Sequence, residues 1–496
     1  MKKVILITLF VCLNLLAFSQ VRFKITVGGV YNEYGRCVRE TYDTNYITIG
    51  STGSFGAGNS DIYFVKCDSL GTTYVKKTIG SPMIEQAYWF EETYDHNLII
   101  TGYTNNTTAN GYDLYLVKAN EHGDKIWEKT IGGTDWDFGY CVQENPADSG
   151  YIIGGTTYSY GKGNADMYLI KTDRNGDTLW TRTYGGTDDD ELKSVKPTSD
   201  GGFILAGYTK SFKDADGDVY LVKTNSVGDT LWTRTYGDTA IEIAHDVVES
   251  INGGYIIGGE TQSFGHTKTG IYVIRTNPSG DPTWTRSNSP VAQKKIVNSL
   301  AEESDGTIAF TGTMDVYLGG NLDGLFFRYD ALGNYTGTWA SFEGTGVGTL
   351  QDEELFSITL THDKGYIMCG YTDTIYSGFG SYPNVFILKL DSNETKPSYF
   401  YTFVAPEINP LVAAEVYPNP LNENGTMTLE SSKPFNDNTT LVITDMLGRN
   451  ASGFFNLTRS GINKYSINSE APAGIYSITI LENGNAIGRI NFSVVR

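Results

Sequence analysis

The sequence has little cysteine and histidine: five of each occur among its 496 residues. So few cysteines, without any CxxC spacing, exclude a dense disulfide framework and a zinc site built on such pairs. No HExxH, GxSxG or phosphate-cradling glycine motif is present, and the histidines show no metal-ligand spacing. These absences argue against an enzyme, although residues from distant parts of a fold can still assemble a catalytic site.

Positive charge is also scarce. The 37 lysines and arginines are outnumbered by 57 aspartates and glutamates, which gives a formal net charge of −20. An acidic chain is a poor partner for nucleic acid, whose phosphates require Lys and Arg. An anionic membrane surface is disfavoured for the same reason.

The only long apolar run is Val4–Leu16, near the N-terminus. Lys2 and Lys3 precede it and small residues follow it, a pattern that predicts a secretory signal peptide over residues 1–19. The run is too short to span a membrane, and we expect no transmembrane segment in the mature chain, which starts near Gln20. The mature chain keeps four cysteines, for which we expect no disulfide: Cys37, Cys67, Cys141 and Cys369.

Glycine (57) and tyrosine (34) are abundant, which favours short strands joined by tight turns. A segment first seen as DIYFVK recurs about every 52 residues, and such a period indicates a propeller, a solenoid or an array. Successive copies begin at Asp61, Asp113, Asp166, Asp218, Gly270, Asp323 and Asn384.

Each repeat contains four strand-sized pieces, for example LKSVKPT, GFILAGYT, DVYLVKTN and TLWTRTYG. Alternating apolar residues and turns rich in Gly, Asn and Asp support this division. Four strands repeated seven times predict an all-β fold, a seven-bladed β-propeller. The order of a glycine pair, a tyrosine strand and a tryptophan strand loosely resembles the kelch pattern, which implies no particular function.

The seventh repeat lacks a good fourth strand, and the missing piece occurs at the other end of the chain. FKITVGG at Phe23–Gly29 matches WEKTIGG and WTRTYGG of the inner repeats. We therefore expect the N-terminal strand to complete the seventh blade, so that the ring has no open edge. The predicted domains are a propeller over residues 20–404, a linker over 405–415 and a C-terminal domain over 416–496.

The C-terminal segment follows a different pattern of short strands, which predicts a small β-sandwich. It opens with YPNP, continues with DMLGR and PAGIYSITI, and ends on a basic residue. Together these motifs resemble the type A C-terminal sorting domain of the type IX secretion system of certain Gram-negative bacteria. The residues that carry the resemblance are Tyr417, Pro418, Asn419, Pro420, Asp445, Gly448, Gly474, Tyr476 and Arg496.

The resemblance implies Sec export, recognition by the type IX machinery, and a final location at the outer cell surface or outside the cell. It also implies that the tail is usually removed, with attachment to surface lipopolysaccharide or release of the remainder. The propeller repeats resemble those common in proteins that carry this domain. An ordinary terminal β-domain that stays attached is the alternative.

Two residue types recur at fixed repeat positions, and we interpret both as structural. We expect the carboxylate at the start of each first strand to accept hydrogen bonds from backbone N–H groups. The alternative is that these carboxylates together form a ring that binds a cation. A tryptophan on the fourth strand fits packing between blades better than sugar stacking. These residues are Glu33, Glu85, Asp137, Asp190, Glu242 and Glu353, with Lys295 breaking the series, and Trp127, Trp180, Trp232 and Trp284.

Calcium is the only cofactor that the sequence suggests. Asp214, Asp216 and Asp218 have the spacing of half a calcium loop, but the glycine precedes the third aspartate and no closing glutamate follows. Solvated turns are the competing interpretation.

The leading functional hypothesis is a surface or secreted binding module for a glycan or another envelope protein. Its candidate contacts lie in variable loops that open on one face of the propeller, namely Tyr376, Phe379, Tyr382 and His266. The alternatives are a hydrolase or lyase acting on extracellular polysaccharide, and a passive structural protein. The enzyme would use Asp188, Asp189, His245 and His266.

Overall fold

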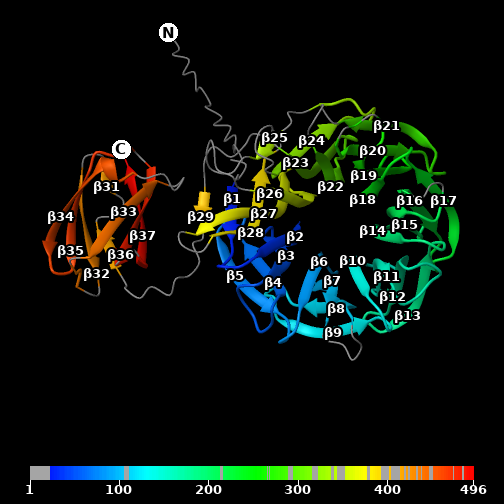
Figure 1. Ribbon diagram of the computed structural model, residues 1–496, viewed down its shortest axis with the longest axis horizontal. Coiled ribbons are helices and arrows are strands. Elements are labelled where there is room, and N and C mark those ends of the chain that lie inside the picture. Colours follow the sequence, from blue (N-terminus) through cyan, green and yellow to red (C-terminus); the bar gives the residue numbers. More distant parts are fainter. Residues whose placement is uncertain are drawn as a thin grey trace, which may run out of the picture.

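The structure is a computed structural model in which nearly all regular structure is β-strand (Figure 1). The residues that it describes are 23–105, 111–212, 216–264, 266, 268–288, 294–315, 322–336, 340–342, 352–376, 380–391, 401–403, 414–417, 421–422, 425–431, 434–436, 438–445, 451–472, 474–482 and 485–495. The prediction of an all-β fold is confirmed.

Seven antiparallel sheets, here blades 1 to 7, follow one another around a ring, each entered through its innermost strand (Figure 1). The first strands are β2 (Glu33–Glu40), β6 (Glu85–Glu92), β10 (Asp137–Glu144), β14 (Asp190–Pro197), β18 (Glu242–Glu249), β22 (Lys295–Glu302) and β26 (Glu353–Leu360). The second strands are β3 (Tyr46–Thr52), β7 (Leu98–Thr104), β11 (Tyr151–Thr157), β15 (Phe203–Thr209), β19 (Tyr255–Thr261), β23 (Ile308–Asp315) and β27 (Tyr366–Tyr376).

The outer half of each blade is built in the same order. The third strands are β4 (Asp61–Cys67), β8 (Asp113–Ala119), β12 (Asp166–Thr172), β16 (Asp218–Thr224), β20 (Gly270–Thr276), β24 (Leu322–Tyr329) and β28 (Gly380–Leu390). The fourth strands are β5 (Thr73–Ile79), β9 (Lys125–Ile131), β13 (Thr178–Tyr184), β17 (Thr230–Tyr236), β21 (Pro282–Asn288) and β25 (Ala340–Phe342).

The core of the ring lies between neighbouring blades. Every residue of β4, β8, β12, β16 and β20 is buried, because the third strands are covered on both sheet faces. In the outer strand β13 every residue but Tyr184 is exposed or half-buried, since only one of its faces meets the next blade. Apolar residues on adjacent sheets therefore form the successive hydrophobic clusters of the ring.

The two outer strands of blade 7, β1 and β29, come from the N-terminal and C-terminal ends of the part of the chain that forms the ring. β1 (Phe23–Val27) pairs antiparallel with β28, and β29 (Tyr401–Phe403) pairs in parallel with the other edge of β1. Three side chains of β1 are almost completely buried, namely Phe23, Ile25 and Val27. They pack with residues of blades 1 and 7 in one cluster.

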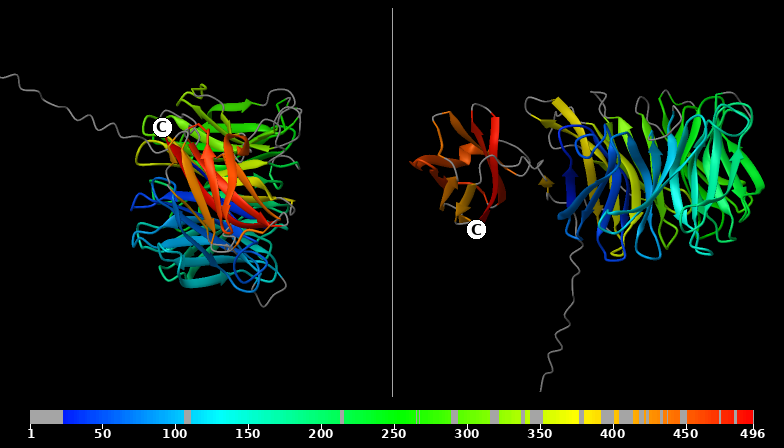
Figure 2. Two further views of the ribbon diagram at one scale, coloured as in Figure 1. Left: turned by 90° about the vertical axis from the view of Figure 1, so that its left-hand side faces the viewer. Right: turned by 90° about the horizontal axis from the view of Figure 1, so that it is seen from below.

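The two flat sides of the ring differ, as the edge-on view in Figure 2 helps to follow. The loop face carries the connections between blades and those between second and third strands. The turn face carries the short turns between first and second strands and between third and fourth strands. This division follows from the antiparallel order of the strands.

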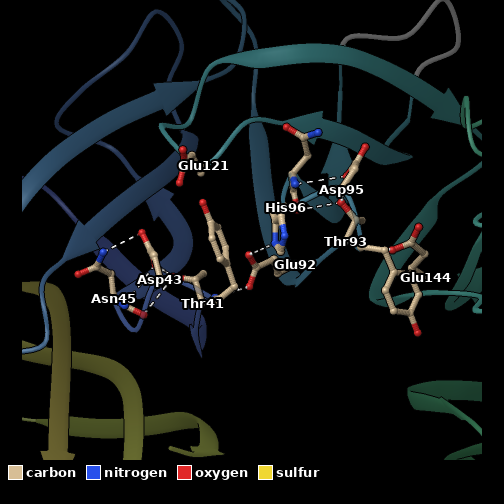
Figure 3. Close-up of polar contacts among 12 residues, drawn as sticks. Thr41, Asp43, Asn45, Glu92, Thr93, Asp95, His96, Glu121 and Glu144 are labelled. Atoms are coloured by element: carbon tan, nitrogen blue, oxygen red, sulfur yellow. Dashed lines mark hydrogen bonds and ion pairs between the residues drawn. The ribbon is translucent and has the colours of Figure 1, made fainter. Parts of the chain in front are cut away.

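Polar contacts on the turn face link neighbouring blades, and Figure 3 shows those among blades 1, 2 and 3. The backbone N–H of Tyr42, in the first turn of blade 1, donates to Glu92 of blade 2 at 3.0 Å. Across the junction of blades 7 and 1, the N–H of His362 donates in the same way to Glu40 at 2.7 Å. Within blade 1, the buried ammonium of Lys66 lies 2.8 Å from Asp43 of that turn.

The C-terminal segment forms two four-stranded sheets around its own core (Figure 1). One sheet contains β30 (Ala414–Tyr417), β32 (Thr426–Ser431), β35 (Lys464–Ser469) and β34 (Phe455–Gly461). The other contains β31 (Leu421–Asn422), β37 (Asn485–Val495), β36 (Gly474–Glu482) and β33 (Thr439–Asp445), and a single short 3₁₀ turn, η1, spans Ser452–Phe454. Within the described parts of the chain, no helix has the length and apolar character needed to cross a membrane.

Candidate functional site on the loop face

Every first strand contains a β-bulge at the same repeat position. In β2 the pairing with β3 shifts between Gly35 and Cys37, which leaves Arg36 as the extra residue. A β-bulge changes the direction of the extra residue's side chain. On the innermost strand of a blade, we infer that this side chain points into the central channel of the ring. The seven bulged residues, here called the collar, are Arg36, Tyr88, Tyr140, Lys193, His245, Asn298 and Phe356.

The collar residues of neighbouring blades contact one another. The guanidinium of Arg36 lies 4.4 Å from the ring centre of Phe356 and 5.7 Å from that of Tyr88. The rings of Tyr88 and Tyr140 are 5.2 Å apart, and the ammonium of Lys193 is 5.0 Å from the Tyr140 ring. From blade 7 through blade 4, the collar residues therefore form a continuous series of contacts along the inner strands.

Five aromatic residues rise from the collar toward the loop face between blades 2 and 3. This aromatic platform consists of Tyr103, Tyr112, Trp136, Phe138 and Tyr158. Trp136 is 46% exposed and Tyr158 is 36% exposed. The Trp136 ring lies 5.8 Å from Tyr112, 6.3 Å from Phe138 and 6.2 Å from Tyr158. Such a cluster is rigid, because each ring is supported by others.

Carboxylates surround the platform. Burial raises the pKa of the Tyr158 hydroxyl, and the charges of Glu191, Asp189 and Asp135 raise it further. Glu191 accepts hydrogen bonds from Tyr208 at 2.9 Å and from Lys193 at 2.8 Å. The platform thus presents apolar ring faces next to hydrogen-bond acceptors.

The predicted residue His245 belongs to the collar. Its Nε2 atom is buried and has no hydrogen-bond partner among the described residues; a carboxylate oxygen of Glu260 lies 3.9 Å away. Burial lowers the pKa of His245 to about 3, and the positive charges of Lys193 and Lys294 add to that effect. Burial raises the pKa of Glu260. This arrangement keeps the histidine neutral.

The predicted residue His266 lines a cavity of about 360 Å³ between the loops of blades 5 and 6. The other lining residues are Gln262, Lys268, Thr269, Lys294 and Asp315. Lys268 pairs with Asp315 at 2.5 Å. His245 and His266 therefore occupy different surroundings, one in the channel and one in a loop cavity.

The remaining residues of the hydrolase hypothesis have other partners. Asp189 lies 3.0 Å from the ammonium of Lys210, and the backbone N–H of Asp188 donates to Ser211 at 3.0 Å. Among the contacts of the described residues, none joins either aspartate to His245 or His266.

The recurrent carboxylates are buried, and five of them accept hydrogen bonds from the loop that precedes them. Glu33 accepts hydrogen bonds from the backbone N–H of Gly29 at 2.8 Å and from the hydroxyl of Thr52 at 3.0 Å. The other members contact equivalent groups: Glu85 with Ser81, Asp137 with Gly133, Asp190 with Gly186, Glu242 with Asp238, and Glu353 with Thr372. In blade 6 the equivalent residue is Lys295, whose pKa is lowered by burial.

The recurrent tryptophans contact the following blade. The Trp127 ring lies 6.0 Å from the ring of Tyr151, and that of Trp232 lies 5.8 Å from Tyr255. A Cβ atom on Gly228, which has φ +81°, would come within 2.9 Å of the Trp180 ring. Trp284 donates through Nε1 to the carbonyl of Ala331 at 3.1 Å.

The calcium hypothesis stays a prediction. Asp214 lies outside the described residues, Asp216 lies in the adjoining loop, and the buried Asp218 opens β16. Among the residues that the structure describes, no three His, Cys, Asp or Glu side chains are grouped as a metal site would require.

Of the other three predicted contact residues, only Tyr382 has a described side chain. Tyr382 packs against Tyr31 with ring centres 6.3 Å apart. Phe379 lies outside the described residues, and Tyr376 ends β27, where only the backbone is described. The sequence analysis missed the collar and the platform. One signal was available: the collar residue always lies three positions after the start of the first strand and varies from blade to blade.

The sorting motif is described in part. Tyr417 ends β30, Asp445 ends β33, and Gly474 opens β36. Tyr476 is buried against Phe455, and its hydroxyl donates to the carbonyl of Pro472 at 2.8 Å. Pro418, Asn419, Pro420, Gly448 and Arg496 lie outside the described residues, as does the predicted signal peptide.

Several solved structures resemble the chain at 10–12% sequence identity. A fungal alcohol oxidase in complex with copper aligns with a TM-score of 0.45 and 11% identity, over 96% of this chain and 98% of that one. Puromycin hydrolase aligns with a TM-score of 0.47 and 10% identity, over 82% of this chain and 62% of that one. The α-L-arabinofuranosidase of Fusarium graminearum aligns with a TM-score of 0.40 and 12% identity, over 74% of this chain and 97% of that one. Such values carry no inference about activity.

No curated protein matches the sequence. A family model does match its C-terminal part: residues 415–490 fit the secretion system C-terminal sorting domain. The match covers most of the two small sheets and ends within β37. The C-terminal segment of this β-propeller protein is therefore a sorting domain of the type IX secretion system, which implies export to the cell surface or beyond it.

Proposed function

We propose that this protein is an exported binding module whose aromatic platform holds a glycan. The observation that carries the proposal is the exposure of Trp136 and Tyr158 on rings that support them from below. Exposed aromatic side chains on a rigid scaffold bind the apolar faces of ligands at little entropic cost. Sugar rings present such faces.

The carboxylates around the platform support a polyhydroxyl ligand. Asp135 lies next to Trp136 in the chain, and Glu191 and Asp189 act electrostatically on Tyr158. Ionised carboxylates only accept hydrogen bonds, and sugar hydroxyls can donate them. Ring faces would supply affinity, and these acceptors would fix the orientation of the sugar.

The proposed scaffold is a seven-bladed propeller over residues 20–404, followed by a linker and the sorting domain at 416–496. In this scaffold β1 acts as a latch, which means that it closes the ring by completing blade 7. The pairing of β1 with β28 supports the latch. The loop contacts of Glu33 and the blade contacts of Trp127 support structural roles for both recurrent residue types. The kelch-like resemblance adds no function to this scaffold.

The proposed route is Sec export directed by residues 1–19, then passage through the type IX machinery of a Gram-negative bacterium. The matched sorting domain supports the second step. A polysaccharide of the surroundings is the proposed ligand, and an envelope protein is the alternative partner.

The test is retention of the chain from Gln20 on a panel of immobilised polysaccharides, with and without calcium. Trp136→Ala should reduce retention at least tenfold, since it removes the most exposed ring of the platform. Tyr94→Ala is the matched control, because Tyr94 is 69% exposed on the turn face. Calcium dependence would support the metal hypothesis for Asp214, Asp216 and Asp218.

Three outcomes would contradict the proposal: no retention on any polysaccharide, equal loss in both variants, or no loss in either. Release of reducing sugar ends during the assay would favour the hydrolase alternative. A hydrolase should also lose turnover in Asp189→Asn while it keeps substrate binding.

A further inference from the structure

Arg36 is the one arginine of the collar, and aromatic rings surround it. Its guanidinium lies 4.4 Å from the ring centre of Phe356, 5.1 Å from that of Tyr34 and 5.7 Å from that of Tyr88. These rings come from blades 7, 1 and 2 and hold the cation through their faces. The Arg36 side chain is half-buried.

Among the described residues, Arg36 has no ion-pair or hydrogen-bond partner. Its neighbour on the same strand, Arg39, differs: it donates to the carbonyl of Val38 at 2.7 Å and to the hydroxyl of Thr359 at 2.9 Å. A guanidinium has five N–H donors, and donors left unused in a half-buried site cost free energy. The chain has 57 acidic residues to 37 basic ones, yet no described carboxylate pairs with this arginine.

The unused donors lie next to the aromatic platform. Tyr88 contacts Arg36 on one side, and its ring lies 5.8 Å from that of Tyr103 on the other. Burial raises the pKa of Tyr103, while the charge of Arg36 acts in the opposite direction. Tyr88 and Tyr103 therefore form a chain of contacts between the guanidinium and the platform.

We propose that Arg36 binds the anionic group of an acidic sugar residue in the glycan held by the platform. This inference rests on the proposed function and names its ligand class. The planar fork of a guanidinium matches a carboxylate or a sulfate ester in a bidentate manner. Most of the net charge of −20 is screened, because charges farther than about 8 Å interact weakly at physiological salt. The carboxylates of Glu354 and Asp373, which act on the Tyr34 ring, are nearer and oppose an anionic ligand, so the guanidinium has to outweigh them.

The experiment measures calorimetric affinities of the chain from Gln20 for three oligosaccharides of equal length: an oligogalacturonate, a sulfated galactan and a neutral galactan. The wild-type protein should prefer an acidic probe to the neutral one. Arg36→Met should weaken binding of that acidic probe by about ten- to hundredfold, the usual effect of losing hydrogen bonds to a charged group. Binding of the neutral probe should not change.

Two further variants separate binding from folding. Arg36→Lys keeps the charge but loses the fork, and should give an intermediate affinity for the acidic probe. Arg39→Met is the matched control: it should lower Tm, because it removes contacts between blades 1 and 7, without changing the affinity of the folded protein. A preference for the oligogalacturonate would identify a carboxylate as the bound group, and a preference for the sulfated galactan would identify a sulfate ester. Both results support the inference.

The inference is overturned if the wild type binds the neutral probe as tightly as the acidic ones. It is also overturned if Arg36→Met and Arg36→Lys both bind the acidic probe like the wild type. In either case a loss of all binding in Trp136→Ala would leave the proposed glycan function standing. Absence of binding to every probe would contradict both.

Discussion

At the scale of single residues, the collar shows how one repeat position can be chemically diverse within a fixed frame. Each bulge residue is preceded by a small or apolar residue, such as Gly35, Ala244 and Val297, that packs between blades. The bulged side chain faces the channel and is free of that constraint. His245 and Arg36 thus occupy equivalent positions with different surroundings: burial keeps the histidine neutral, and aromatic rings surround the arginine.

The pKa of His245 gives a prediction for stability against pH. Because the folded-state pKa is about 3 and the unfolded value is near 6.5, the unfolded state binds the proton more readily. The contribution of His245 to stability is therefore complete above pH 6.5 and is lost progressively between pH 6.5 and 3. The slope from this group can reach about 1.4 kcal/mol per pH unit.

The measurement is urea unfolding of the wild type and His245→Gln at pH 7 and pH 4. The wild type should lose more stability than the variant on acidification. The comparison removes the effect of Glu260, whose raised pKa acts with the opposite sign. His122→Gln, at a side chain that is 61% exposed, is the control. Equal acid losses in the wild type and His245→Gln would refute a neutral histidine at this half-buried position.

At the scale of elements, β1 is the proposed latch of the ring. It buries Phe23, Ile25 and Val27 at the junction of blades 7 and 1, and it covers an edge of β28 that would otherwise be open. We predict that Ile25→Ala lowers the free energy of unfolding by about 2–5 kcal/mol, as expected for a large core side chain. Thr26→Ala, at a half-buried position of the same strand, should cost much less.

Thermal and denaturant unfolding of both variants tests the latch. A chain that begins at Gly29 should be less stable still, and a synthetic peptide of residues 20–28 should restore part of the loss. If Ile25→Ala and Thr26→Ala unfold alike, β1 is not a latch.

The sequence allowed a good prediction of the strands and a poor one of the site. The predicted pieces LKSVKPT and TLWTRTYG correspond closely to β14 and β17, because alternation and turn residues are local signals. The bulge is not local: it depends on the pairing of two strands, so Arg36 and Tyr140 were not recognised as channel residues. Trp136, Tyr112 and Tyr158 come from two blades and meet only because neighbouring blades pack together.

At the scale of the whole molecule, the propeller and the sorting domain have separate cores. We therefore predict that deletion of residues 416–496 leaves the thermal unfolding of the propeller unchanged, with Tm altered by less than about 2 °C. The same deletion should abolish delivery to the cell surface in the producing bacterium. Cell fractionation and calorimetry test the two halves of this prediction; surface delivery without the tail would contradict the assigned role of residues 415–490.

The most direct test of the account locates the ligand on the molecule. Hydrogen–deuterium exchange of the chain from Gln20 should be compared with and without the best-binding oligosaccharide. The account predicts protection confined to the loop face, at the segments that contain Tyr112, Trp136 and Tyr158, and at the Arg36 bulge. Protection confined to the turn face, for example around Tyr42 and Tyr94, would contradict it.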